Sequence, residues 1–406
     1  MTGAPREFDP FALTGKTDRY AVFKQFRAEA PIARGAPPFP PTRRGVYLFA
    51  SDLVEQALKH PALPHAPPGD YEAVRNEAAK NFAWGQMIRW MLLSDPPRHA
   101  QLRRPVAAWF SETTTRGLEG RLRESAAKLT AAAGSRGNFD VVREVVVPFV
   151  VHALDCFLGI EIADIEWFRK RTAHLAVVLD LRQEGGWDDA NAAMRDLCTF
   201  AERELDRRSA PGEPRLVDAM LDLQRSGQWT RDEVVESTVL FLLTGQETII
   251  DGLGNAIVAL AQHPDQAEKL RAGLAVDGRV VDELLRFDAP VQFAGSRIAA
   301  SDFALDGFAI AAGEPVTAVL ASANRDETCF RNADELDLER TDGRRQLSFG
   351  SGAHHCIGQH LARLEMRVLL DALYCAMPRW TLDLDGVERR KNISWRGVVS
   401  APARIG

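Results

Sequence analysis

One short segment near the end of the chain limits most strongly what this sequence can fold around. Residues 349–358 read FGSGAHHCIG, so Cys356 directly follows a glycine-rich loop. Glycines let a backbone approach a flat group closely and take conformations that a Cβ would block. Leu361, Leu364 and Val368 recur at helical spacing, which predicts a helix directly after the cysteine. The orphan N–H groups and the positive dipole at a helix N-terminus favour a thiolate, so the segment predicts a thiolate presented to a metal.

The pattern F-G-x-G-x-H-x-C-x-G is complete in this segment, and it resembles the haem-binding loop of the cytochrome P-450 superfamily. The resemblance implies that Cys356 is the thiolate ligand of a haem b iron, with further cofactor contacts from Phe349, Gly350, His354 and Gly358. Thiolate ligation pushes electron density onto the iron and favours cleavage of the O–O bond. For a cysteine without such a loop, the alternative is a buried core residue beside an ordinary turn.

The composition is that of one ordinary globular chain. The sequence has 406 residues, is 46% hydrophobic and 26% charged, and contains no linker or repeat that would divide it. We therefore expect one domain over residues 1–406, in the cytoplasm, with no signal peptide and no membrane segment. The net charge of −6 argues against a nucleic-acid binder. The five cysteines include no C-x-x-C pair, which argues against a disulfide framework or a zinc cluster.

Helical patterns dominate most of the chain, and strand patterns gather in its later part. Ser51 is expected to cap a short helix that runs to Lys59. A capping box that begins at Thr230 opens a long helical run that ends before Pro264. Strand-like segments occupy residues 291–298, 303–310, 315–321 and 394–399. The balance predicts a mainly α fold with a small β portion, which fits the P-450 fold of a helical lobe beside a smaller β-rich lobe.

The long helix carries polar residues that an apolar helix does not explain. Residues 244–248 read TGQET between apolar neighbours, and burying Glu247 and Thr248 without partners would be costly. The segment resembles the superfamily's A-G-x-[D/E]-T oxygen-activation motif, with Thr244 in place of the usual alanine. The resemblance implies that Thr248 opens a groove for O2 and water and relays protons, and that Glu247 supplies them. The other interpretation is a polar patch that faces a neighbouring helix.

A further motif is implied to be structural. Residues 283–286 read ELLR, which resembles the superfamily's E-x-x-R, and Arg340 stands where a second arginine joins that pair. The resemblance implies that Glu283, Arg286 and Arg340 form a buried network with no catalytic role. Taken alone, the acid and base three residues apart would fit any surface helix equally well.

The residues that would hold the haem propionates come from three segments. The run DPPRHAQLR at residues 95–103 resembles the superfamily's D-P-P-x-H-x-x-x-R and places a histidine and an arginine four residues apart. Two propionates need cationic or donor partners, and the fork of an arginine suits a carboxylate. The resemblance implies a set formed by His99, Arg103, Arg297 and His354.

The substrate pocket can be outlined by position in the superfamily fold. Its expected lining comprises Phe82, Trp84, Met87, Ile88, Leu240, Phe241, Thr244, Phe293, Ala294 and Val398. Each of these residues could equally belong to the core. The set predicts a small-molecule substrate that is mainly apolar.

The expected electron source lies outside the chain, because no segment resembles a flavin or nicotinamide site. The resemblance implies a ferredoxin and a ferredoxin reductase as separate chains. An acidic ferredoxin would be steered to a basic surface on the cysteine side. The arginines that the fold would place near that side are Arg98, Arg104, Arg344, Arg345 and Arg363.

Together these features predict a haem-thiolate monooxygenase that inserts one oxygen atom from O2 into its substrate, by hydroxylation, dealkylation or epoxidation. One alternative is a peroxygenase that takes its oxidant from hydrogen peroxide, against which the Glu247–Thr248 pair argues. The other is a non-catalytic haem-thiolate sensor, which would need neither a proton relay nor a redox surface.

Overall fold

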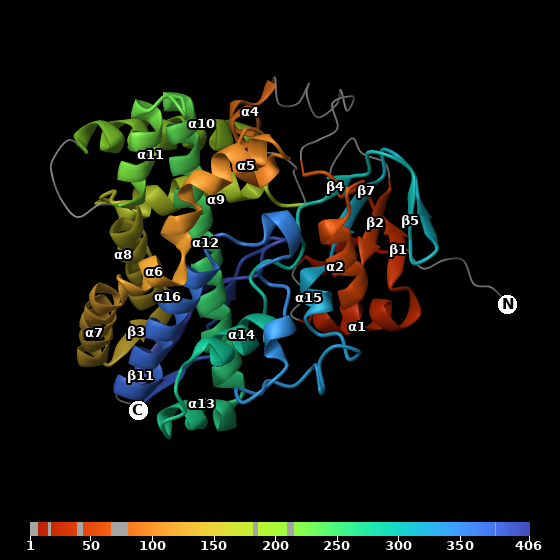
Figure 1. Ribbon diagram of the computed structural model, residues 1–406. Helices are drawn as coiled ribbons and strands as arrows, with labels where there is room; N and C mark the ends of the chain where they lie inside the picture. The colour runs from red at the N-terminus through yellow and green to blue at the C-terminus, as the bar shows by residue number, and fades with distance from the viewer. Residues whose placement is uncertain are drawn as a thin grey trace.

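A large helical lobe lies beside a smaller lobe that holds most of the strands (Figure 1). The computed structural model describes residues 7–14, 18–38, 44–65, 80–181, 186–208, 215–377 and 379–406. The helices are α1 (Tyr20–Glu29), α2 (Ser51–Lys59), α4 (Phe82–Met87), α5 (Arg98–Arg103), α6 (Glu112–Arg116), α7 (Glu119–Arg136), α8 (Val147–Leu158), α9 (Ile165–Val178), α10 (Trp187–Arg207), α11 (Leu216–Arg225), α12 (Arg231–Gln262), α13 (Pro264–Arg271), α14 (Gly278–Phe287), α15 (Leu320–Ala323) and α16 (Gln359–Asp371). The prediction of a mainly α fold with a small β portion is confirmed.

The strands are short and form four small sheets. They are β1 (Ile32–Gly35), β2 (Gly45–Leu48), β3 (Asn138–Asp140), β4 (Arg297–Ile298), β5 (Phe303–Leu305), β6 (Phe308–Ile310), β7 (Pro315–Ala318), β8 (Trp380–Leu382), β9 (Glu388–Arg389), β10 (Val398–Ser400) and β11 (Pro402–Ile405). The largest sheet has the order β1-β2-β7-β4, and its one parallel pair, β2 with β7, sets Val46 beside Val316. A second sheet, β3-β11-β8, brings the end of the chain against the segment that follows α7.

Helix α12 runs through the middle of the helical lobe (Figure 1). Its start is the expected capping box, since the Thr230 hydroxyl accepts from the Glu233 N–H at 3.2 Å and the Glu233 carboxylate accepts from the Thr230 N–H at 2.6 Å. Most of its side chains are buried, and it ends at Gln262, before Pro264. At 1.5 Å per residue the helix is about 48 Å long, so its middle lies deep inside the lobe.

The start of α2 differs from the prediction. Ser51 is its first helical residue, not its cap, and Ala50 stands at the N-cap position without a side-chain hydrogen bond. The Ser51 N–H instead donates to the Asp326 carboxylate at 2.7 Å. A residue distant in sequence therefore satisfies the helix start, which a local pattern cannot reveal.

The predicted strands are shorter than the patterns indicated. Residues 303–310 form two strands, β5 and β6, and within residues 315–321 only Pro315–Ala318 is a strand, because α15 begins at Leu320. Within residues 291–298 only Arg297–Ile298 forms a strand, and Val291 makes an isolated bridge to Trp395. Within residues 394–399 only the last two residues belong to β10. The segment from 290 to 296 instead leaves the sheet, and Val291 lines the cavity described below. No helix in the described ranges combines the length and the apolar character that a membrane crossing requires.

Candidate active site

A cavity lies where α12, α16 and the loop before α16 meet. Cys356 forms part of its wall, and Thr248 of α12 lines the same space. Most of the other lining residues are apolar. They include Met91, Leu92, Phe110, Leu154, Phe157, Leu240, Phe241, Ile249, Leu285, Pro290, Val291 and Leu361. The cavity thus combines a thiol, a hydroxyl on a long helix and a mainly apolar wall.

The loop before α16 takes a conformation that only glycine adopts easily. Gly350 has φ +68° and Gly352 has φ +77°, in the left-handed region where a side chain would be strained. The Cys356 N–H donates to the Phe349 carbonyl at 2.9 Å, which folds the loop back beneath the cysteine. Helix α16 begins at Gln359, so the cysteine precedes the helix and is not within its first turn.

The thiol is not made acidic by its position alone. Burial raises the pKa of Cys356, while the Gly358 N–H and the charges of Arg103 and Arg363 oppose that shift without overcoming it. The Gly358 N–H and the two arginines thus favour the thiolate, as expected near a helix start, but in the protein alone burial outweighs them. A cation bound at the sulfur would supply the missing stabilisation, since a coordinated thiol loses its proton.

One end of the site carries a ladder of three histidines. The His354 ring stacks on His65, with centroids 3.4 Å apart, and on His99, with centroids 4.0 Å apart. Burial lowers the pKa of His65 to about 2 and that of His354 to about 3. The Nε2 atoms of all three rings are buried, and none has a hydrogen-bond partner among the residues that the structure describes. Buried polar atoms without partners indicate a ligand with polar groups at this end.

Two arginines complete this end. Arg103 donates to the His355 carbonyl at 2.5 Å and lines the cavity. Arg297 is buried, and its Nη1 reaches the carbonyls of Leu58 and Leu63 at 3.0 and 3.3 Å. Burial lowers the pKa of Arg297 to about 10, against the opposing charge of Asp95, so the guanidinium keeps its charge at neutral pH. An anionic group would be stabilised here.

The donor set fits a haem. A group that matches this site needs three parts. It needs a cation for the Cys356 sulfur, a flat apolar body for the aliphatic and aromatic walls, and anionic ends for the histidine ladder and the arginines. Iron protoporphyrin IX has these three parts, with two propionates at one edge. His65 belongs to this end as well and was not found from the sequence, because no motif surrounds it and stacking cannot be deduced from spacing.

On α12 the two motif residues face different surroundings. The Thr248 hydroxyl donates to the Thr244 carbonyl at 3.0 Å and lines the cavity. Glu247 does not line it: its carboxylate is buried, accepts from the Thr172 hydroxyl at 2.9 Å and is paired with Arg390. The acid that the motif implies as a proton donor is therefore held by a salt bridge behind the cavity wall.

Of the expected pocket residues, the structure brings Leu240, Phe241 and Thr244 to the cavity. Phe293 is in another place: its ring packs among aromatic rings, 5.9 Å from Phe23 between centroids. Phe82 is 38% exposed and lies beneath Arg195 of α10.

The remaining expected pocket residues do not line this cavity either. Val398 is buried against α12, 3.0 Å from where a Cβ on Gly254 would stand. Ala294 packs at the edge of the β lobe's core, and its N–H donates to the Ala318 carbonyl at 2.9 Å. Met87 is buried in the core of the helical lobe, Trp84 packs against that core, and Ile88 is half-buried in the same segment.

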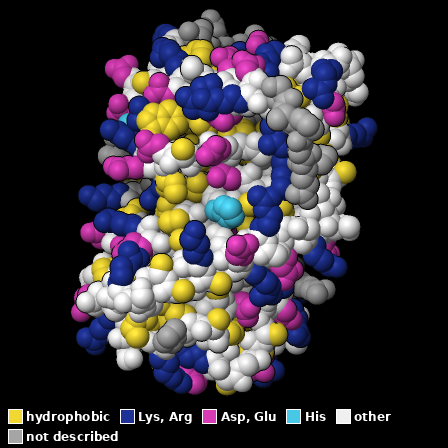
Figure 2. Space-filling model, turned by 90° about the vertical axis from the view of Figure 1, so that its left-hand side faces the viewer, with side chains coloured by type: hydrophobic (Ala, Val, Ile, Leu, Met, Phe, Trp, Pro, Cys, Tyr) yellow, Lys and Arg dark blue, Asp and Glu magenta, His cyan; other side chains and the backbone are white. Residues whose placement is uncertain are grey.

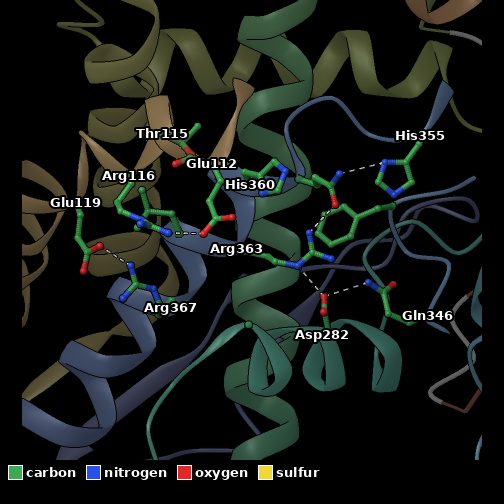
Figure 3. A pocket seen from close by; sticks show the side chains of 14 residues that line it. Glu112, Thr115, Arg116, Glu119, Asp282, Gln346, His355, His360, Arg363 and Arg367 are labelled. Carbon is green, nitrogen blue, oxygen red and sulfur yellow. Dashed lines mark hydrogen bonds and ion pairs between the residues drawn. The ribbon is translucent and has the colours of Figure 1, made fainter. Parts of the chain in front are cut away.

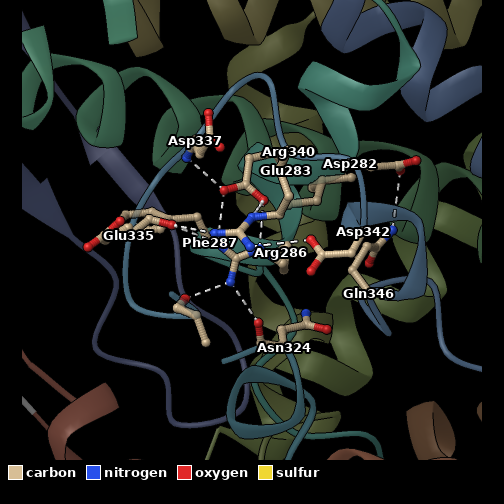
Figure 4. A network of polar contacts seen from close by, with 12 residues as sticks. Asp282, Glu283, Arg286, Phe287, Asn324, Glu335, Asp337, Arg340, Asp342 and Gln346 are labelled. Carbon is tan, nitrogen blue, oxygen red and sulfur yellow. Dashed lines mark hydrogen bonds and ion pairs between the residues drawn. The ribbon is translucent and has the colours of Figure 1, made fainter. Parts of the chain in front are cut away.

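Glu283 binds both expected arginines (Figure 4). Its carboxylate lies 2.6 Å from Arg286 Nε and 2.9 Å from Arg340 Nε, and neither Glu283 nor Arg286 is exposed. Arg286 also donates to the carbonyls of Asn324 and Ala333. The network therefore ties α14 to the segment that leads to the cysteine loop.

On the outer side of the cysteine loop the surface is hollowed (Figure 3). Its arginines are matched by acids: Arg363 lies 2.9 Å from Asp282, and Arg367 lies 2.6 Å from Glu119. The face seen in Figure 2 likewise mixes basic and acidic side chains. Of the arginines expected to form a basic surface, Arg98 is paired with Glu233 and the Arg344 side chain lies outside the described residues.

Arg104 and Arg345 are exposed, and neither forms an ion pair with any residue that the structure describes. The basic surface is thus narrower than the sequence indicated. Acids from α7 and α14 pair with arginines of α16, and only the folded structure reveals such pairs.

The comparisons with known proteins agree on one family. A family model described as "Cytochrome P450" matches residues 278–404. "Vitamin D(3) 25-hydroxylase" of Pseudonocardia autotrophica is 31% identical over 414 residues, covering 100% of this chain and 98% of that protein. "Cytochrome P450 monooxygenase PikC" of Streptomyces venezuelae is 33% identical over 320 residues, covering 77% of this chain and 75% of that one.

Solved structures share the fold along nearly the whole chain. The crystal structure of CalO2 superposes with a TM-score of 0.88 at 28% identity, covering 98% of this chain and 99% of that one. The tirandamycin C-bound P450 monooxygenase TamI superposes with a TM-score of 0.84 at 27% identity, covering 99% of this chain and 100% of that one.

Proposed function

This chain belongs to the cytochrome P450 family and is a monooxygenase, and on that premise we propose that it inserts one oxygen atom from O2 into a small, mainly apolar organic molecule. The observation that carries the proposal is that the half-buried Cys356 thiol and the Thr248 hydroxyl line one mainly apolar cavity. Hydroxylation, dealkylation and epoxidation are all within this chemistry.

The haem would be held by residues on three sides. Cys356 would ligate the iron, with Phe349, Gly350 and Gly358 shaping the loop around the sulfur. The propionates would pair with His99, Arg103, Arg297 and His354, and we add His65 to this set because it stacks on His354. When bound, the haem supplies the activation of O2, and the protein supplies ligation, orientation and protons.

Thr248 and Glu247 would divide the delivery of protons. The Thr248 hydroxyl faces the cavity, where it can accept a proton from one side and donate one to the other. Glu247 would take up a proton on leaving Arg390 and pass it on after turning toward Thr248. The apolar wall, with Leu240 and Phe241, excludes bulk water from the reacting centre.

The substrate class follows from the same wall. Met91, Leu92, Phe241 and Ile249 offer apolar contact, and the Thr244 hydroxyl is already engaged by the Leu240 carbonyl at 2.8 Å. Burial of apolar surface would therefore supply most of the binding. One relative is named a vitamin D(3) 25-hydroxylase, and TamI was solved with tirandamycin C bound. Both names fit a mainly apolar substrate class.

Electrons would come from a separate ferredoxin and its reductase. Of the arginines expected on the cysteine side, Arg104 and Arg345 are exposed and form no ion pair with a described acid, so they are the candidates for steering an acidic ferredoxin. Replacing both with glutamine should slow reduction at low salt and leave substrate affinity unchanged. Arg225→Gln, at the end of α11 and paired with Asp222, is the control.

The test is turnover of the haem-loaded protein with a surrogate ferredoxin, its reductase and a panel of apolar compounds under isotope-labelled O2. The proposal expects a product that carries one labelled oxygen atom. Label entering only from added hydrogen peroxide would indicate the peroxygenase. The absence of any substrate-dependent O2 consumption across the panel would indicate the sensor.

A further inference from the structure

A second buried acid stands one helical turn after Glu247. Asp251 also lies on α12, and the Arg390 guanidinium reaches both carboxylates. Its Nη2 pairs with Glu247, and its Nε lies 2.8 Å from Asp251 Oδ1. The three side chains are at most 9% exposed. Two buried carboxylates thus share one guanidinium, which keeps a small exposed edge.

The two acids are solvated unequally by the protein. Glu247 also accepts hydrogen bonds from Thr172 at 2.9 Å and Gln246 at 2.8 Å. Neither oxygen of Asp251 accepts a hydrogen bond of normal geometry from any described residue. Its contact with Arg390 is close enough for an ion pair but is not aligned as a hydrogen bond. Buried charges need such bonds. A proton shared between the two acids therefore belongs to Asp251.

On the side of Asp251 that faces Gly397, there is no room for a water molecule or side chain that could donate a hydrogen bond to it. A Cβ built on Gly397 would stand 1.8 Å from Asp251 Oδ1, so the carboxyl presses on the backbone there. Four charged groups act on the Asp251 carboxyl. They are Glu247 on the same helix, Arg389 of β9, Arg390 directly after β9, and Arg169 of α9. Burial and the charge of Glu247 raise the pKa of Asp251 to about 7, while the charge of Arg390 opposes them.

We propose that Asp251 is a positioning residue for Glu247. When Asp251 is protonated, Arg390 forms its ion pair with Glu247 and holds that carboxylate behind the cavity wall. When Asp251 is ionised, it competes for the same guanidinium and frees Glu247 to turn toward Thr248. The step moves one proton from Asp251 to solvent and breaks no covalent bond in the protein other than that O–H. The inference rests on the proposed role of Glu247 as proton donor.

The first test is the pH profile of coupled turnover in the holoenzyme with a surrogate ferredoxin and reductase, measured as O2 consumed against hydrogen peroxide released. In the wild type, coupling should rise with pH through about 7, as Asp251 ionises. Asp251→Asn stays neutral, so it should keep the low-pH behaviour throughout, with turnover above that pH lower by roughly tenfold. Asp288→Asn is the control. Asp288 is a buried acid paired with Arg396, which follows Arg390 in the chain, and this variant should keep the rise of coupling with pH.

The second test reads the proton itself and needs no turnover. Infrared difference spectra of the holoenzyme should show the carbonyl band of a protonated acid that is lost as pH rises and is absent from Asp251→Asn. In Glu247→Gln the guanidinium is left to Asp251, so the band should be lost at a pH lower by more than about one unit. Asp155→Asn removes the other described aspartate whose pKa burial raises to about 7, and it serves as the background.

The outcomes separate the two claims. A pH step that persists in Asp251→Asn, or a band in Glu247→Gln that titrates as in the wild type, would overturn the inference and leave the proposed function intact. Unchanged coupling in Glu247→Gln would instead remove the proposed role of Glu247 itself. If Asp251→Asn does not fold, the comparison of the wild type with Glu247→Gln in the Asp155→Asn background still decides.

Discussion

Thr248 and Glu247 are neighbours on α12, yet one lines the cavity and the other is clamped by Arg390 behind it. Successive residues of a helix point about 100° apart, so the two side chains cannot face the same space without a turn of the longer one. We therefore propose that the proton path depends on this ion pair as well as on the two motif residues.

Replacing Thr248 with alanine should separate O2 consumption from product formation. The cavity would lose the hydroxyl that carries protons, so the yield of product per O2 should fall roughly tenfold while hydrogen peroxide rises. Thr238→Ala is a matched control, because Thr238 makes the same type of bond, to the Val234 carbonyl at 2.8 Å, on a part of α12 that does not line the cavity. Equal uncoupling in both variants would contradict the relay.

Glu283→Gln should destabilise the fold without touching the chemistry. It leaves the buried charges of Arg286 and Arg340 without their carboxylate, a change that typically costs about 3–5 kcal/mol. Urea denaturation measures the loss. Glu112→Gln breaks a pair with Arg116 whose two side chains are 65% and 68% exposed, and it should cost less than about 1 kcal/mol. A small loss in Glu283→Gln would show that the network is not a structural anchor.

His65→Phe should weaken haem retention. Phenylalanine keeps the stacking on His354 but removes the buried Nε2 that faces the anionic end of the site. Transfer of haem to an excess of apomyoglobin should be several-fold faster than in the wild type. His60→Phe is the control, since His60 stacks on Phe303 and takes no part in the ladder. Identical transfer rates would exclude His65 from the cofactor site.

The haem-free protein should lose stability as the pH falls. Burial holds the pKa of His65 near 2 and that of His354 near 3, whereas histidine in an unfolded chain titrates near about 6.5. Below that pH the unfolded chain binds more protons, so the free energy of unfolding should drop by up to about 1.4 kcal/mol per pH unit for each histidine. His65→Phe should remove about half of this slope in urea titrations. An unchanged slope would contradict the burial of this ring.

Most features of the fold that depend on local sequence pattern could be predicted. The mainly α fold, the capping box at Thr230 and the long helix through the middle of the lobe follow from spacing, and the structure confirms them. The cysteine loop is readable for the same reason, because its glycines are required by backbone conformation within the loop itself.

What the sequence could not supply depends on partners distant in the chain. The pairing of Glu247 with Arg390 joins residues on α12 and beside β9, and no spacing rule connects them. His65 became a site residue only through stacking on His354. Phe293 was assigned to the pocket by position, but it packs with Phe8 and Phe23 in a separate aromatic core.

The measurement that tests the central claim most directly is the absorption spectrum of the dithionite-reduced protein with carbon monoxide, for the wild type beside Cys356→Ala. A strongly red-shifted Soret band in the wild type that the variant lacks is the result we predict, because only thiolate ligation produces it. An unshifted band, or a red-shifted band that persists in Cys356→Ala, would contradict the assignment of Cys356 as the haem ligand.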